Sequence, residues 1–177
     1  MLSASKTDLK SNPWNIGDVY AYRFHKHKSK QAHMFGKFIL LQKIADEEWC
    51  DGIILSRLQL YDKIFDALPK TFDPHDCRIL PADSPKRFVD QTQENLFPAL
   101  DLNVLMVIYK RKDYPLKDLI YVGNFENPYS YPFANPNSSA HNWFDIEDWY
   151  CHYRHLWKDF QYEIDEFQNV KITTYKL

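Results

Sequence analysis

Histidines are the residues whose spacing first suggests chemistry. His25 and His27 alternate along the chain near His33, so two imidazoles could converge on a metal ion. Lysines surround them and disfavour a bound cation, so we predict a solvated basic loop instead. His152 and His155 lie three positions apart on a predicted helix, and no second ligand pair accompanies them. We therefore expect surface histidines, with no metal and no cofactor.

Cysteines offer a second candidate chemistry, that of a nucleophilic thiolate. Cys50, Cys77 and Cys151 are far apart, form no CxxC pair and lie in no nucleophile elbow. The sequence also contains neither a Walker-type phosphate loop nor a GxGxxG motif. We predict that the protein is not an enzyme.

Composition bounds the compartment and the partners. An odd number of cysteines without an apolar leader is typical of reduced thiols in the cytoplasm. No segment approaches the roughly 20 apolar residues that cross a bilayer, so no membrane partner is expected. The net charge of −2 and the pI near 6.4 argue against a basic nucleic-acid surface. We predict a cytoplasmic protein for which nucleic acid is an unfavoured ligand.

An aromatic and acidic stretch in the last third of the chain suggests protein binding. The loop 124–142 and the acidic start of the helix after it combine hot-spot aromatics with carboxylates that steer a basic partner. A solvated helix face is the alternative. The predicted partner-binding residues are Tyr129, Tyr131, Phe133, Trp143, Asp145, Glu147 and Asp148.

Runs of β-branched and aromatic residues must supply the scaffold that positions this surface. The predicted strands are 18–24, 37–44, 49–60, 77–80, 102–110, 119–122 and 170–175, and we expect 102–110 and 119–122 to pair as a hairpin. Apolar residues recur at helical spacing from Asp145 to Phe160. The predicted fold is α+β and mostly β, a twisted antiparallel sheet or partly open barrel with a C-terminal amphipathic helix. Residues 1–13 are expected to form a flexible arm and 14–177 a single globular domain.

Alternation along the first strands predicts part of the core. A strand with one buried face must place every second side chain inside. We expect the core positions to include Val19, Ala21, Phe38, Leu40 and Ile44.

Two short motifs in the first third of the chain resemble a known family. The run Gly17–Tyr22 (GDVYAY), the run Phe35–Leu40 (FGKFIL) and a later apolar strand with Trp49 are similar to the immunity protein 26 family of bacterial toxin systems. The resemblance implies a mostly β fold and a non-enzymatic protein that binds and blocks a cognate toxin. Such a toxin could be a basic nuclease, which matches an acidic inhibitor surface.

Two other functions remain open from the sequence. Aromatic residues stand beside basic ones in 20–24 and 108–112, which is the pattern of a small β-barrel that stacks single-stranded nucleic acid. A hydrolase that uses the loop containing His25 and His27 is a less favoured reading. The net charge favours the inhibitor over the nucleic-acid module.

Overall fold

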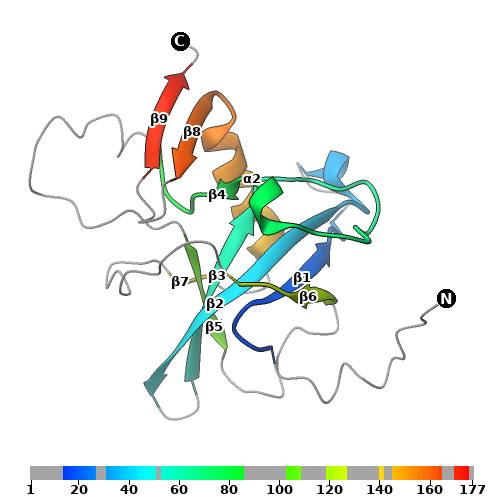
Figure 1. Ribbon diagram of the computed structural model, residues 1–177, viewed down its shortest axis with the longest axis vertical. Coiled ribbons are helices and arrows are strands. Elements are labelled where there is room, and N and C mark those ends of the chain that lie inside the picture. Colours follow the sequence, from blue (N-terminus) through cyan, green and yellow to red (C-terminus); the bar gives the residue numbers. More distant parts are fainter. Residues whose placement is uncertain are drawn as a thin grey trace, which may run out of the picture.

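One large sheet forms the centre of the molecule (Figure 1). The computed structural model describes residues 14–26, 31–50, 53–85, 103–108, 119–126, 140–141, 145–164 and 170–175. The strands of the large sheet are β1 (Asp18–Arg23), β2 (Phe38–Cys50), β3 (Ile53–Tyr61), β4 (Ile79–Leu80), β5 (Asn103–Ile108), β6 (Leu119–Asn124) and β7 (Ala140–His141).

The strand order of this sheet is β6-β1-β2-β3-β5-β7, and β4 pairs with β3 beside that path. Neighbours from β6 to β5 are antiparallel, whereas β7 is parallel to β5. A second, two-stranded sheet contains β8 (Phe160–Ile164) and β9 (Val170–Tyr175), and the helix α2 (Ile146–Trp157) precedes it. Across the described residues the path stays open, so the predicted α+β, mostly β fold is confirmed as an antiparallel sheet and not as a closed barrel.

Both faces of the central strands are buried, which alternation alone did not predict. Tyr20 and Tyr22 of β1 point into the main core, where they join the apolar residues of α2. Val19 and Ala21 point the other way, into a second cluster with Leu40. The expected core positions are confirmed for Val19, Ala21, Leu40 and Ile44, while Phe38 is half-buried against the second cluster.

The second cluster exists because the chain after β3 folds back over the sheet. Phe38 and Phe65 exchange backbone hydrogen bonds of 2.8 and 3.0 Å. Farther along the same segment, the Phe72 ring lies edge-on to Tyr61 and Cys77 is buried. This segment covers the second face of the sheet, which would otherwise be exposed to water. As a result, β1 and β2 are nearly continuous runs of buried residues.

The helix α2 is held against the main core by its apolar face. Its buried residues include Ile146, Trp149, Tyr150 and Trp157, at the spacing of an amphipathic helix. The Tyr150 hydroxyl donates to the Tyr61 carbonyl at 3.0 Å, and the Trp157 indole donates to the Asp83 carbonyl at 2.8 Å. The helix is shorter than predicted, because it ends at Trp157 and the chain then enters β8.

The predicted hairpin between 102–110 and 119–122 is wrong. Both segments are strands, but β5 pairs with β3 and β6 pairs with β1, so β1, β2 and β3 stand between them in the strand order. In this register Leu119 lies opposite Tyr22 and enters the main core. Burial of that side chain selects the partner strand, which a run of apolar residues does not specify.

Other predicted strands differ from the observed strands at their boundaries, and the predicted N-terminal arm falls outside the described residues. Residues 49 and 50 belong to the end of β2, so the predicted strand 49–60 begins at Ile53 instead. The tail strand Val170–Tyr175 is present as β9, and the strand predicted at 77–80 is the shorter β4. The predicted arm, 1–13, lies outside the described residues. In the part of the chain that the structure describes, no helix is both long and apolar enough to cross a bilayer.

Candidate functional site

The start of α2 is anchored to the end of β1 through one carboxylate. Glu147 Oε1 accepts hydrogen bonds from the Tyr22 hydroxyl at 3.0 Å and from the His25 backbone N–H at 2.6 Å. Its Oε2 accepts from the Lys26 backbone N–H at 3.1 Å. The residue is 1% exposed. Backbone groups that leave the sheet at residues 25 and 26 thus find their acceptor on the helix.

This burial corrects the prediction that Glu147 contacts a partner. A side chain that is enclosed and saturated with donors has little surface to offer a second protein. The sequence predicted one acidic surface of Asp145, Glu147 and Asp148, because carboxylates are favourable at the positive end of the helix dipole. Only the packing of α2 against β1 separates the buried carboxylate from the exposed ones.

The two flanking carboxylates face solvent. Asp145 occupies the N-cap position and is exposed, and its side chain makes no capping hydrogen bond to the described helix. Asp148 is 53% exposed and forms an ion pair of 3.1 Å with Lys26. An exposed pair of this kind contributes under about 1 kcal/mol to stability. Both carboxylates can therefore act at the surface.

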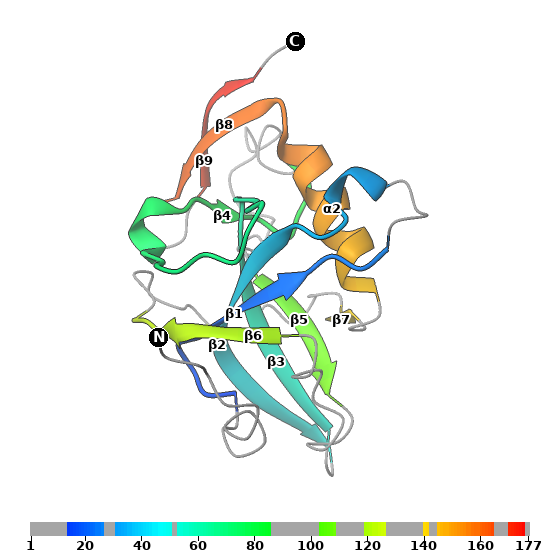
Figure 2. The same cartoon turned by 90° about the vertical axis from the view of Figure 1, so that its right-hand side faces the viewer.

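Apolar side chains are exposed on β6, the outermost strand in the sheet order. Ile120 and Tyr121 keep 39% and 42% of their surface, and Ile16, in the turn before β1, keeps 61%. The strand reads LIYVGN and carries no charged residue, although charges commonly protect such edges. In Figure 2, β6 lies next to β1 and faces the viewer. As consecutive strand residues, Ile120 and Tyr121 point to opposite faces, so exposed apolar groups flank this sheet edge on both faces, and exposed apolar groups of this kind can mark an interaction site.

Tyr22 contacts both β6, which carries the exposed apolar residues, and the start of α2, which carries the carboxylates. Its backbone pairs with Leu119 at the beginning of β6, and its hydroxyl donates to Glu147 at the beginning of α2. The exposed strand and the exposed carboxylates are thus joined through one buried side chain. We call this combination of Ile16, Ile120, Tyr121, Asp145 and Asp148 the edge surface.

The remaining predicted contacts cannot be placed on this surface. Tyr129, Tyr131, Phe133 and Trp143 lie outside the described residues. Ile120 and Tyr121 are not among the predicted contact residues, because the pattern of residues 119–122 indicates only a strand. The absence of any charge from β6 was the available signal.

Histidines that are distant in sequence come together. His25, His33, His152 and His155 are exposed, and His27 lies outside the described residues. Three of them, His33, His152 and His155, line one cavity between α2 and the short helix η2 (Ala32–Met34). Among described residues, no three histidine, cysteine or acidic side chains are arranged to hold a metal ion.

The thiol of Cys151 also lines this cavity. Burial raises its pKa from 9.0 to about 11, although nearby Arg154 opposes the shift. Such a thiol is protonated near neutral pH and is a weak nucleophile. The cavity therefore does not present an activated cysteine.

We expect alkylation of Cys151 to be slow in the folded protein. Since the pKa rises from 9.0 to about 11, its thiolate is about a hundredfold less populated at about pH 8 than in an exposed cysteine. The rate should rise with pH until the thiol ionises near 11. Iodoacetamide labelling followed by peptide mass spectrometry measures it, with the urea-unfolded chain as the control. Equal rates in the folded and unfolded chains would contradict the expectation.

Comparison with known proteins adds no relative. No protein-family model matches the chain, and no curated protein or solved structure is significantly similar to it.

Proposed function

We propose that this chain is a non-enzymatic binding protein of the immunity type, which binds and neutralises a cognate bacterial toxin. The observation that carries the proposal is the edge surface, where an uncharged, exposed strand is joined to exposed carboxylates. The resemblance of Gly17–Tyr22 and Phe35–Leu40 to immunity proteins supports the same conclusion, because these runs form β1 and the start of β2.

The scaffold beneath the edge surface is suited to holding it in one conformation. Tyr121 stacks edge-on against buried Tyr20 with ring centroids 5.4 Å apart. The Asn124 side chain donates to Asp18 Oδ1 at 2.8 Å and to the Ile16 carbonyl at 3.0 Å, which ties the end of β6 to the turn before β1. A surface that is ordered before binding loses less entropy when a partner docks.

The chemistry of the surface indicates a partner with an apolar centre and basic surroundings. Ile120 and Tyr121 supply the apolar contact, and Asp145 and Asp148 supply negative charge. Nuclease toxins carry basic residues because they hold nucleic acid, so a basic nuclease is the toxin class we favour. Tyr131 and Trp143 remain predicted contacts of the same partner.

The direct test is rescue of growth. The product of the gene immediately upstream is the candidate toxin, and it is expressed in a bacterial host, alone and together with this chain. We expect growth arrest by the toxin alone, recovery on co-expression, and a stable complex in gel filtration. Absence of both rescue and complex would overturn the proposal. Binding of a single-stranded oligonucleotide instead, lost at high salt, would favour the nucleic-acid module.

Changes on the edge surface should weaken that complex without unfolding the chain. Ile120→Asp places a charge in the apolar contact, and we expect at least about a tenfold loss of affinity, mainly through faster dissociation. The matched control is Leu68→Asp, since Leu68 is 40% exposed but lies in the segment after β3. The double change Asp145→Asn and Asp148→Asn should slow association several-fold and lose its effect at high salt.

Surface plasmon resonance against the toxin domain separates the two rates. Circular dichroism shows whether each variant remains folded. If Ile120→Asp and the double variant both bind like the parent, the toxin contacts another surface. If Leu68→Asp weakens binding as much as Ile120→Asp, the effect is not specific to β6.

A further inference from the structure

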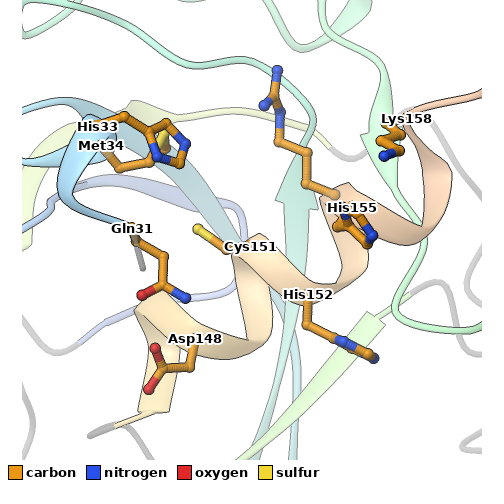
Figure 3. Close-up of a pocket in the computed structure, with 9 residues that line it drawn as sticks. Gln31, His33, Met34, Asp148, Cys151, His152, His155 and Lys158 are labelled. Atoms are coloured by element: carbon orange, nitrogen blue, oxygen red, sulfur yellow. The ribbon is translucent and has the colours of Figure 1, made fainter. Parts of the chain in front are cut away.

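A cavity of about 640 Å³ lies between η2 and α2 (Figure 3). Figure 3 shows the sulfur of Cys151 pointing from α2 towards the segment that carries Gln31, His33 and Met34. His152, His155 and Lys158 follow along the helix. A volume of this size lies within the range of about 300–1,000 Å³ that small-molecule sites occupy.

Two cationic side chains line this cavity. Asp62 is shared by two guanidinium groups, since it pairs with Arg78 and also with Arg154 Nε at 3.3 Å. One carboxylate cannot neutralise two arginines, so one positive charge remains, and Arg154 brings it to the cavity wall. Lys158 adds a second cation, whose pair with Asp159 is long at 4.0 Å and exposed to solvent.

The carboxylates near these cations are engaged by other groups. Among the described lining residues, Asp148 is the sole carboxylate, and it is engaged by Lys26 at 3.1 Å. Glu147, the preceding residue of α2, is buried and accepts hydrogen bonds from the Tyr22 hydroxyl and from backbone N–H groups. Cys151 stays a neutral thiol, because burial raises its pKa to about 11. Thus the groups facing the cavity are neutral, cationic or already paired.

Three imidazoles complete the lining. His33 comes from η2, and His152 and His155 come from the exposed side of α2. Each ring can donate an N–H hydrogen bond to an anion. Charge-assisted hydrogen bonds from imidazolium, guanidinium and ammonium groups are the contacts that bind phosphate-like oxyanions most strongly.

We propose that this cavity binds the phosphate group of a small organic molecule, with His33, His155, Arg154 and Lys158 as the principal donors. The four proposed donors lie outside the edge surface, and only Asp148 borders both sites, so the inference goes beyond toxin binding and does not depend on it.

Sulfate is the probe that tests this site. It has the tetrahedral shape and the negative charge of phosphate. Sulfate is titrated into the ¹⁵N-labelled chain at constant ionic strength while NMR follows the imidazole signals. We expect saturable shifts of the His33, His152 and His155 signals.

Variants assign the effect to the cavity. The double change His33→Gln and His155→Gln and the single change Arg154→Gln should each weaken sulfate binding about tenfold or more. His75→Gln is the matched control, because His75 is equally an exposed histidine but belongs to the short helix η3 (Pro74–Asp76), outside the cavity. Circular dichroism of each variant confirms that the fold is retained.

Three results would overturn the proposal. One is a response to sulfate that is linear and unsaturated. Another is an unchanged affinity for sulfate in the His33→Gln, His155→Gln double variant. The third is an equal loss of affinity in His75→Gln, which would show that the effect is not specific to the cavity.

Discussion

Replacing Leu40 with aspartate will unfold the protein. Leu40 is fully buried in β2, opposite Ala21, and packs in the cluster that covers the second face of the sheet. An unpaired carboxylate in that position loses its hydration, and a buried aliphatic group is lost with it. We expect a destabilisation above about 4 kcal/mol, which is a large share of the stability of an ordinary domain. Circular dichroism and a thermal melt measure it.

The matched control for Leu40→Asp is the same kind of change at a sheet edge. Ile120→Asp replaces an aliphatic side chain that is 39% exposed on β6, where the new carboxylate stays hydrated. We expect this variant to melt within a few degrees of the parent, corresponding to about 1 kcal/mol or less. A Leu40→Asp variant that melts within about a degree of the parent would contradict the assignment of β2 to the core.

Replacing Glu147 with alanine should produce the second-largest effect. The change removes the acceptor of the buried Tyr22 hydroxyl and of the backbone N–H groups of His25 and Lys26. Leaving such donors without an acceptor costs about 1–3 kcal/mol for each fully buried group. Because residues 25 and 26 are nearer to solvent and can recruit water, we expect a total of about 3 kcal/mol. A urea titration measures the free energy of unfolding.

Two further variants make the result specific to the buried carboxylate. Asp148→Ala removes the carboxylate of the next residue in the same helix. Its exposed ion pair with Lys26 contributes under about 1 kcal/mol to stability. Glu147→Gln keeps one carbonyl oxygen as an acceptor and should recover part of the stability. If Glu147→Ala and Asp148→Ala are equally mild, Glu147 does not anchor α2 to β1.

Local pattern in the sequence determined where most of the described secondary structure would form. β1, β2 and β6 begin within a residue of their predicted starts, and the tail strand β9 matches its predicted bounds. Apolar residues at Ile146, Trp149, Tyr150 and Trp157 identified the buried side of α2. These features depend on periods of two and 3.6 residues, which are written in the order of the side chains themselves.

The tertiary structure alone decided which elements meet. Nothing in β6 names β1 as its partner, because register and pairing follow from which side chains the assembled core can bury. Lys43 illustrates the same limit: it is 2% exposed, and its ammonium group donates to the Trp14 carbonyl at 2.7 Å and pairs with Asp46 at 2.5 Å. A lysine in a strand suggests a solvent-facing position, and only the tertiary structure brings the Trp14 carbonyl to it from 29 residues away.

The candidate functional surfaces likewise depend partly on sequence pattern and partly on tertiary structure. Sequence pattern identified the acidic start of α2, but only packing against β1 divided it into a buried anchor, Glu147, and the exposed Asp145 and Asp148. Sequence pattern also predicted that His152 and His155 lie near one another on a helix. Their approach to His33 required η2 to fold against α2. Charge and side-chain type are local properties of a chain, whereas burial and proximity arise from contacts between residues far apart in sequence.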